Sequence, residues 1–289
     1  MSFEKKRGKK LLVISLLIIC ILLLGACAPM QTSGGITLNK NELTVIVFNV
    51  GQADSIFIHT PQNENILIDA ANNTDGEYLT EKLTWLGVNK IDYFFLTHPH
   101  ADHIGGADDI INNFEISNIY APKVYQDTQT YKEVLNAALN KGIKITSAKP
   151  CTIELSNATM NILSPTKDKY SDLNAYSIVL KFTYMDFDML FMGDLPKVQE
   201  KDILNSNLKC DIIKIGHHGS QTSTSEAFLT KTGCNYAVIS VGFDNDYGHP
   251  SDATLKLLEK YNIQVYRTDY DGDIIITSGG KDINIKNGN

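Results

Sequence analysis

The sequence predicts an α/β fold of one large domain, in which two β-sheets pack together and helices cover their outer faces. The first observation is a series of apolar runs that are rich in β-branched and aromatic residues and bounded by turn residues, as is typical of buried strands. The second is a set of segments with apolar residues at helical spacing, which alternate with those runs along the chain. Two sheets between two layers of helices would bury the apolar faces of all these elements.

The first 41 residues are expected to lie outside this domain, which we place at residues 42–289. Five basic residues precede an apolar stretch of 14 residues, Leu11–Leu24, in which Ser15 is the one polar residue, and small residues follow it up to Cys27. This order is typical of a secretory signal peptide over residues 1–26, because a membrane-spanning helix needs about 20 apolar residues. An uncleaved N-terminal anchor is the alternative, and both interpretations place the domain outside the cytoplasm.

The LLGAC segment that ends at Cys27 resembles a bacterial lipobox. This resemblance implies that Cys27 becomes the lipidated first residue of the exported protein, with residues 27–41 as the lipidated cysteine and a short tether. We therefore expect a lipoprotein that is anchored in a membrane through this lipid and faces away from the cytoplasm.

Within the domain, the sequence predicts a meander of strands first and then an alternation of helices and strands. The clearest helical stripe consists of Leu79, Leu83 and Leu86, which would share one face of a helix. The expected helices are at 78–86, 104–114, 131–139, 224–229 and 253–261, and the expected strands are at 43–50, 55–60, 65–70, 91–97, 160–165, 177–184, 188–194, 211–216, 236–242, 264–268, 273–278 and 283–286.

Composition limits the functions that the chain can serve. The formal charge is −7, and it becomes −11 from Cys27 onward, because the first 26 residues hold five of the 26 Lys and Arg and one of the 33 Asp and Glu. An acidic protein is unsuited to a broad basic contact with nucleic acid, so we expect no stable nucleic-acid complex. The three cysteines within the domain, Cys151, Cys210 and Cys234, are widely spaced and are expected to be buried free thiols.

One short segment constrains function more than the rest of the chain. Residues 97–106 read THPHADHIGG and follow the apolar run IDYFFLT, so four polar side chains would emerge from the end of a buried strand. Imidazole and carboxylate groups this close together converge when a cation neutralises and orients them. The segment therefore predicts a metal site that includes His98, His100, Asp102 and His103.

This HxHxDH pattern after a strand resembles the signature segment of the metallo-β-lactamase superfamily. Six further segments occur in the order that the resemblance requires, and they are similar to the branch that contains the hydrolase-like domain of ComEC-type competence proteins. They are VGQADSIFI at 50–58, LIDAA at 67–71, FMGDL at 191–195, IKIGHHGSQTS at 213–223, YGHPS at 247–251 and YRTDYDGDI at 266–274. The resemblance implies a four-layer αββα sandwich with the site along one edge.

The resemblance also implies a set of metal ligands and catalytic groups. His98 and His100 would serve a first metal position, Asp102 and His103 a second position, and Asp194 would bridge the two. His217 would complete the second position. Two divalent ions held in this way can share one hydroxide and activate it near neutral pH, and Asp102 would also orient the attacking water.

The chain departs from the family pattern because it has no histidine between His103 and His217. The first position therefore lacks its usual third imidazole, and the segment with Asn174 and Ser177 resembles the stretch found there in ComEC-like proteins. Fewer imidazoles and more oxygen ligands favour manganese or another hard ion over zinc. We accordingly expect one or two divalent ions, zinc or manganese.

Several further residues are expected to support the site. His218 and Ser220 in the GHHGS turn would lie near substrate, and His249 would contact a phosphate oxygen or protonate the leaving group. Asp69 would hydrogen-bond a ligand histidine and fix its tautomer. Asp54 would face the site or cap a turn.

Three functions remain open from the sequence. We favour a metal-dependent hydrolase of phosphodiester bonds outside the cytoplasm, acting on nucleic acid or on a small-molecule phosphoester. An acyl hydrolase of a lactone, thioester or β-lactam is the alternative within the same fold, since the ligand motif alone does not select the bond. The third is a surface-binding lipoprotein without catalytic activity.

Overall fold

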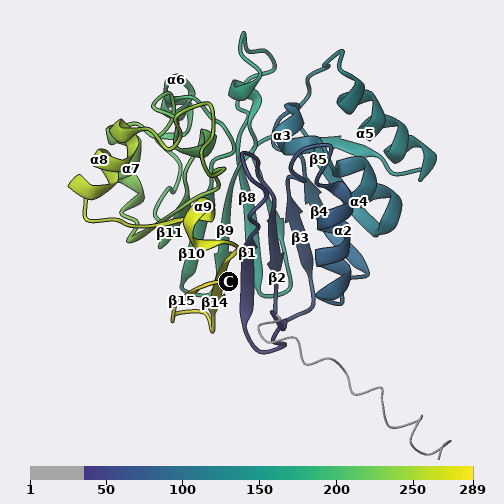
Figure 1. Cartoon of the computed structure of the whole chain (residues 1–289), viewed down its shortest axis with the longest axis horizontal. Coiled ribbons are helices and arrows are strands. Elements are labelled where there is room, and N and C mark those ends of the chain that lie inside the picture. The colour runs from purple at the N-terminus through teal and green to yellow at the C-terminus, as the bar shows by residue number, and fades with distance from the viewer. Residues whose placement is uncertain (1–35, 289) are drawn as a thin grey trace, which may run out of the picture. The chain divides into compact units, whose positions relative to one another are not determined.

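The computed structural model describes residues 36–288, so the expected signal peptide and Cys27 lie outside the described residues. The described part contains two β-sheets (Figure 1). One has eight strands in the order β15-β14-β1-β2-β3-β4-β5-β6, and the other has seven in the order β13-β12-β11-β10-β9-β8-β7. The strands are β1 Leu43–Val47, β2 Ile56–His59, β3 Asn65–Ile68, β4 Lys90–Phe95, β5 Glu115–Ala121, β6 Ile145–Ser147, β7 Cys151–Glu154, β8 Ala158–Ser164, β9 Val179–Tyr184, β10 Phe187–Phe191, β11 Ile212–Lys214, β12 Tyr236–Ile239, β13 Gln264–Arg267, β14 Ile274–Ser278 and β15 Asn284–Asn287.

Helices cover the outer face of each sheet, which confirms the αββα sandwich. Figure 1 shows α2, α4 and α5 beside the first sheet, and α6, α7 and α8 beside the second. The helices are α2 Gly76–Trp85, α3 Ala101–Ile104, α4 Ala107–Asn113, α5 Gln129–Asn140, α6 Lys197–Ile203, α7 Glu226–Thr232, α8 Asp252–Lys260 and α9 Thr268–Asp271, with single 3-10 turns η1 Asn174–Tyr176 and η2 His217–Gly219.

Three apolar layers account for this stacking. The central layer joins the inner faces of the two sheets, where Ile58 and Phe95 of the first sheet share one cluster with Phe182 of the second. Leu79 and Leu83 pack in a second layer between α2 and the first sheet, and Phe228 packs in a third layer between α7 and the second sheet. Each sheet therefore buries both faces, which explains the nearly continuous apolar runs of its central strands.

Strand direction places several loops at one edge. β3, β4, β5 and β6 are parallel neighbours, and so are β10, β11, β12 and β13. Phe95 at the end of β4 pairs with Ile68 of β3, and Lys214 at the end of β11 pairs with Phe191 of β10. The segments that leave the carboxyl ends of these strands include the HxHxDH, FMGDL and GHHGS segments.

The helix expected at 104–114 is divided into α3 and α4, and the physical reason is the close approach of another segment. The backbone N–H groups of Gly105 and Gly106 donate to the carbonyls of Ala71 and Ala70, at 2.7 and 3.0 Å. A side chain at Gly105 would collide with the backbone of Asn72. The two glycines thus hold the HxHxDH segment against the chain that follows β3.

The cysteine expectation holds in part. Cys210 and Cys234 are buried and free, whereas Cys151 is free but exposed at the start of β7, an edge strand that the sequence did not predict. Among residues 36–288, no helix has the length and apolar character needed to cross a membrane.

Candidate metal centre

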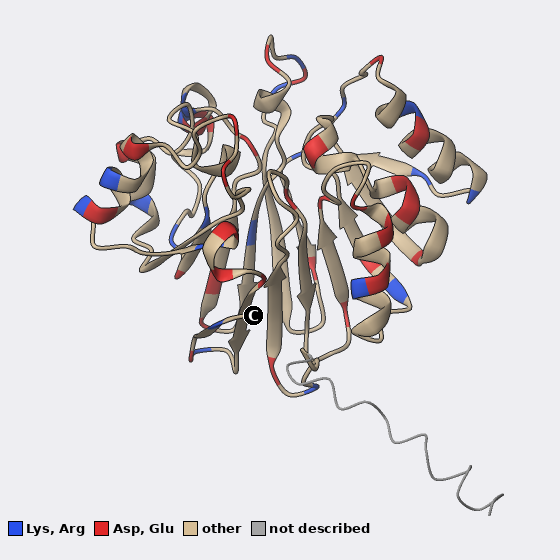
Figure 2. Ribbon diagram, in the orientation of Figure 1, with Lys and Arg blue, Asp and Glu red and all other residues tan. Residues whose placement is uncertain are grey.

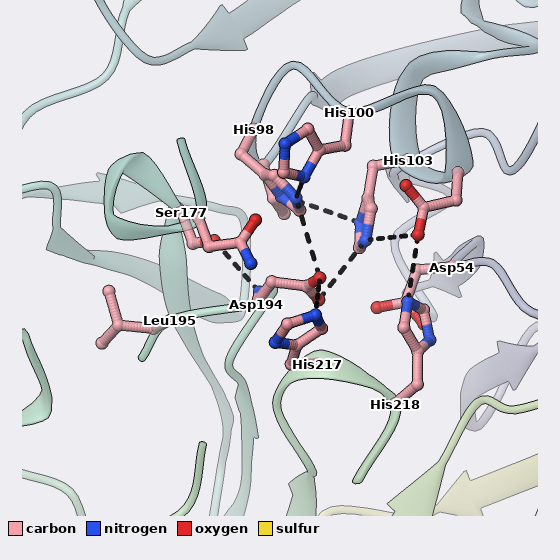
Figure 3. A network of polar contacts seen from close by, with 12 residues as sticks. Asp54, His98, His100, His103, Ser177, Asp194, Leu195, His217 and His218 are labelled. Atoms are coloured by element: carbon pink, nitrogen blue, oxygen red, sulfur yellow. Dashed lines mark hydrogen bonds and ion pairs between the residues drawn. The ribbon is translucent and has the colours of Figure 1, made fainter. Parts of the chain in front are cut away.

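Five histidines and two aspartates converge at the shared edge of the two sheets (Figure 3). Four of them follow β4, one follows β10 and two follow β11. These seven side chains are His98, His100, Asp102, His103, Asp194, His217 and His218.

The HxHxDH segment is shaped by the short helix α3. His100 is the N-cap residue, and its carbonyl accepts from the N–H groups of His103 and Ile104, at 3.1 and 3.0 Å. Asp102 and His103 consequently lie in the first turn of the helix, while His98 remains on the extended segment before it. His98 and His103 are fully buried, and Asp102 keeps a third of its side chain exposed, 33%.

The position of Asp194 depends on the turn after β10. Gly193 has a φ of 51°, and a side chain there would press against Ser177, with Cβ and Oγ at 3.1 Å. The hydroxyl of Ser177 accepts a hydrogen bond from the backbone N–H of Asp194, at 3.0 Å. Ser177 therefore acts through the backbone of Asp194, and a glycine is required beside it.

The two carboxylate oxygens of Asp194 face different histidines. Oδ1 lies 3.3 Å from Nε2 of His103. Oδ2 lies 3.6 Å from Nε2 of His217 and 3.7 Å from Nε2 of His98. A buried carboxylate with this arrangement can bridge two cations.

One group of potential ligands lies on the Oδ1 side. Asp102, His103, Asp194 and His218 each offer a ligand atom within 4.8 Å of the other three. Nε2 of His218 is 3.3 Å from Oδ2 of Asp102, and Nε2 of His103 is 3.8 Å from the same oxygen. His218, rather than the expected His217, therefore lies with Asp102 and His103.

A second group lies on the Oδ2 side. Nε2 of His98 is 3.1 Å from Nδ1 of His100, and His98 and His217 both approach Oδ2 of Asp194. His217 thus stands where the sequence leaves the first position one imidazole short. His217 therefore lies on the side of the first position and His218 on the side of the second. This follows from backbone conformation, since both residues have a φ of 52° and their side chains diverge in Figure 3.

Asp69 supports the buried histidine of the first turn of α3. Its Oδ2 is 2.8 Å from Nδ1 of His103, and its Oδ1 accepts from the backbone N–H of Thr97 at 2.7 Å. The hydroxyl of Thr97 donates to Asp69 at 2.7 Å and lies 3.1 Å from Nδ1 of His98. Asp69 therefore holds Nε2 of His103 toward Asp194, in the position that the sequence assigned to it.

His218 is held by the backbone and by a buried ion pair. Its Nδ1 lies 3.0 Å from the carbonyl of Ser240 and 3.9 Å from Oδ1 of Asp54. Oδ2 of Asp54 pairs with Nζ of Lys214 at 2.9 Å, and both side chains are almost fully buried. Sequence reasoning did not single out Lys214, although a lysine inside the apolar strand DIIKIG was a visible signal of a buried partner.

The remaining predicted residues lie at different depths around the cluster. The His249 ring is 5.7 Å from that of His217, and its Nδ1 is 3.4 Å from Nε2 of Gln52. Ser220 contacts Thr222 at 2.9 Å, and the Thr222 hydroxyl lies 3.2 Å from Nδ1 of His217. Ser220 is therefore connected to His217 through Thr222. Asn174 is partly buried in η1, and its Oδ1 has no hydrogen-bond partner within the described residues.

The pKa shifts within the cluster are those expected where a cation would bind. Burial and the neighbouring His103 lower the pKa of His98 well below its usual range. Burial opposes the charged form of His103, but the carboxylates of Asp194 and Asp69 raise its pKa well above the usual range. Burial likewise opposes ionisation of Asp194, yet His103 and His218 hold the pKa of this carboxyl well below its usual range. The cluster therefore combines ionised carboxylates with imidazoles that cannot all be protonated at once, because a proton on His103 disfavours one on His98.

Unpartnered buried atoms provide a direct test of that fit. Nε2 of His103 and Oδ1 of Asp194 are both buried and make no hydrogen bond within residues 36–288, although they lie 3.3 Å apart. Buried polar atoms are rarely left in this way, and a divalent ion ligated by both would satisfy them. The residues present accordingly fit a metal.

An αββα sandwich with clustered imidazoles and carboxylates at its strand edge defines a metal-dependent hydrolase of the metallo-β-lactamase fold. The chain belongs to the metallo-beta-lactamase superfamily, whose family model matches residues 48–242.

Its relatives place it in the ComEC-like branch of that family. It is 30% identical over 294 residues to ComE operon protein 3 of Bacillus subtilis (strain 168), an alignment that covers 95% of this chain and 37% of that protein. It is 28% identical over 239 residues to competence protein ComA of Neisseria gonorrhoeae, covering 81% of this chain and 32% of that protein. The chain thus spans about a third of the length of these relatives.

One solved structure is similar to this chain in its fold, with little similarity in sequence. It is that of CmlA, a diiron β-hydroxylase from Streptomyces venezuelae, with a TM-score of 0.53 and 11% sequence identity. The match covers 83% of this chain and 54% of that one.

Proposed function

We propose that this protein is a two-metal phosphodiesterase that works outside the cytoplasm. The observation that carries the proposal is the placement of the Asp194 carboxylate, with one oxygen toward His103 and the other toward His98 and His217. Paired sites with a shared carboxylate are typical of enzymes that displace a group at phosphorus, because such sites can clamp both the attacking and the leaving oxygen.

The proposed ligand sets follow from the two groups. His98, His100 and His217 would hold a first ion with Oδ2 of Asp194. The second ion would be held by Oδ1 of Asp194 together with Asp102, His103 and His218. With His217 in the first set, each position has an imidazole-rich ligand set, so the reason for preferring manganese over zinc is weakened.

Divalent ions bound there would supply a water molecule of lowered pKa and would neutralise charge on a phosphoryl oxygen. The protein's own side chains would orient the water and contact the substrate. Asp102 is one-third exposed and its Oδ2 lies 3.3 Å from Nε2 of His218, so its carboxylate is placed beside the second ion position, where it can orient the attacking water. His249 lies beyond His217 and is half-buried, where its ring can donate a hydrogen bond to a phosphate oxygen; burial and the neighbouring His217 lower its pKa, which favours the neutral ring.

Two relatives support a phosphodiester over an acyl bond. ComE operon protein 3 and competence protein ComA are related to this chain along most of its length, and the name of the second refers to competence. We infer from this relationship that a polyanionic phosphodiester is the substrate class. Hydrolysis of an acyl bond is the alternative that the activity test must exclude.

The location of the enzyme is part of the proposal and rests on the sequence before residue 36. A basic segment, a short apolar stretch and LLGAC precede the domain, so we propose export and lipidation at Cys27. The full chain should incorporate labelled fatty acid and begin at residue 27, and Cys27→Ala should abolish both the label and the cleavage. A wild-type chain that carries no fatty acid and keeps its N-terminal residues would favour an uncleaved anchor.

The activity itself is tested with the full chain, purified in detergent and loaded with zinc or manganese. We expect hydrolysis of bis(p-nitrophenyl) phosphate, little hydrolysis of p-nitrophenyl butyrate or nitrocefin, and a loss of at least about a hundredfold in Asp102→Ala. Asp282→Ala removes an exposed carboxyl on the loop before β15 and should keep full activity. Hydrolysis of the ester or of nitrocefin in place of the phosphodiester would reject the proposal.

A further inference from the structure

A second feature of the same edge bears on the length of the substrate. It is a cavity of about 450 Å³ whose lining includes Lys123, Lys149, Lys167, Asp168 and Tyr176. Three lysines around one cavity stand out in a chain with a formal charge of −7. Figure 2 shows acidic and basic residues mixed over both helical layers, without a broad basic face in that view.

Topology places the lysines of this cavity at the same edge of the sheets as the metal cluster. Lys123 lies two residues after β5, and Lys149 two residues after β6, and both strands run parallel to β4, which leads to His98. Lys167 follows β8, which runs in the same direction as β10, the strand that leads to Asp194. All three lysines therefore leave carboxyl strand ends at the edge that carries the metal ligands.

Two local connections link the lining of the cavity to residues of the cluster. Tyr176 lines the cavity, and the next residue, Ser177, accepts the hydrogen bond from the backbone of Asp194 at 3.0 Å. On the other sheet, Ala121 and Pro122 line a small apolar pocket together with His98, and the next residue, Lys123, lines the cavity. The cavity therefore lies on the side of the cluster where His98 and Asp194 are anchored, as a second phosphate site would require.

The charges in the cavity are only partly compensated. Lys167 pairs with Asp202, whereas Lys123 and Lys149 have no ion-pair partner among the described residues. Asp168 is the one acidic residue in the lining. The cavity therefore presents two unpaired ammonium groups at a water-accessible site, which favours an anion with several acceptor oxygens, such as a phosphodiester.

We propose that this lysine cavity binds a second phosphate of the substrate, so that the enzyme acts on a phosphodiester polymer instead of an isolated phosphodiester. This inference rests on the proposed function for the identity of the scissile bond. Nucleic acid strands and polyol phosphate polymers share this chemistry. The cavity is a local subsite with two free lysines, which agrees with the acidic chain having no broad contact surface for nucleic acid.

The test compares two double variants of the full chain. Lys123→Ala with Lys149→Ala removes the free charges of the cavity. Lys40→Ala with Lys281→Ala is the matched control, because both lysines are exposed, have no ion-pair partner among the described residues, and lie at the opposite edge of the sheet, before β1 and after β14. Binding of a fluorescent oligothymidylate of about ten nucleotides to the metal-free protein is followed by anisotropy. Displacement by poly(glycerol phosphate) then distinguishes nucleic acid from phosphodiester polymers in general.

We expect the Lys123 and Lys149 double variant to weaken oligonucleotide binding about tenfold, and to reduce the slope of log affinity against log salt by about 1 to 2. Asp168→Asn should strengthen binding about twofold, a gain that misfolding cannot produce. Replacement of both lysines by arginine should retain binding. Equal effects in the two double variants, or no effect in either, would overturn the proposal.

Steady-state kinetics with two substrates separate this inference from the proposed function. In the metal-loaded wild type, KM for the oligonucleotide should lie well below KM for bis(p-nitrophenyl) phosphate, and the cavity variant should lose most of that difference. Hydrolysis of both substrates with KM values that do not respond to the cavity variant would reject the lysine cavity alone. Lysine-dependent binding without any phosphodiester hydrolysis would reject the proposed function and leave the cavity as a polyanion site.

Discussion

Oδ2 of Asp69 lies 2.8 Å from Nδ1 of His103, behind the ring of a histidine whose Nε2 faces Asp194 at 3.3 Å. Both residues are fully buried, and Asp69 has a φ of 59°, which turns its carboxyl away from β3 and toward the cluster. The carboxylate fixes the tautomer of the imidazole and raises its basicity, so that Nε2 is available as a ligand atom.

Asp69→Asn is therefore expected to lower metal affinity without removing a ligand. An amide of the same size keeps the packing but no longer supports the charge on His103, and the expected loss is about 10- to 100-fold in affinity for one of two ions. Isothermal titration with zinc or manganese measures it directly. Asp282→Asn serves as the exposed control, and unchanged affinity in Asp69→Asn would show that the contact with His103 is dispensable.

The two adjacent histidines of the GHHGS turn should have separate metal phenotypes. His217 approaches Oδ2 of Asp194 at 3.6 Å, whereas His218 lies 3.3 Å from Asp102 on the other side. His217→Ala should thus weaken the first ion and His218→Ala the second, each reducing the metal content from about two ions to about one. Metal analysis after dialysis, combined with the double variant, measures this division.

The double variant distinguishes the alternatives. Independent positions predict that His217→Ala with His218→Ala loses both ions. If either single variant already loses both, the ions bind cooperatively through Asp194; if His217→Ala retains full metal content, His217 is not a ligand.

The sequence predicted the general site but not the division of its ligands. HxHxDH, FMGDL and GHHGS each follow an apolar strand, and the parallel arrangement of those strands brings the segments together as expected. The positions of His217 and His218 depend on two successive left-handed backbone conformations, which residue type does not reveal. A chain without a third histidine in the usual segment can therefore compensate from a neighbouring loop.

Other features required the tertiary structure. The division of the helix at Gly105 depends on the backbone after β3, which lies in contact only in the folded chain. The lysine cavity combines Lys123 and Lys149 from one sheet with Lys167 from the other, and no local pattern joins them. Lys214 was recognisable as a charged residue in an apolar strand, yet its partner Asp54 is 160 residues away.

The buried pair of Lys214 and Asp54 should be important for stability. Their side chains are 1% and 2% exposed, and the atoms Nζ and Oδ2 are 2.9 Å apart. Removing one partner leaves an uncompensated charge in the interior, so Lys214→Met should destabilise the protein by about 3 to 5 kcal/mol. Urea denaturation of the metal-free protein measures this change.

A second substitution tests whether the buried charge is the cause. Lys214→Met combined with Asp54→Leu should recover a large part of the loss, since neither charge then remains. Lys256→Met, at an exposed position of α8, is the control and should change stability by less than about 0.5 kcal/mol. A double variant as unstable as the sum of the two single variants would point to packing instead of charge.

Glu200 provides a test of pH dependence away from the metal ligands. It is 1% exposed in α6, and its carboxylate accepts from the backbone N–H groups of Thr224 and Ser225, at 2.6 and 2.9 Å. Burial raises the pKa of Glu200 above the ordinary value of 4.5, although these hydrogen bonds oppose the shift. The folded protein therefore holds this proton more tightly than the unfolded chain does, and the stabilising contribution of Glu200 grows as pH falls from neutrality through the raised pKa and levels off below 4.5.

The comparison with Glu200→Gln isolates this contribution, because glutamine does not titrate. Urea denaturation of both proteins between about pH 4 and pH 7 should show the wild type gaining stability relative to the variant as the pH falls, by about 1.4 kcal/mol for each unit by which the pKa is raised. At pH 7 the variant should also be less stable by about 1 to 3 kcal/mol, since an amide cannot accept from both N–H groups with equal geometry. A difference between the two proteins that stays constant over this range would mean that the pKa of Glu200 is the same in the folded and unfolded chains.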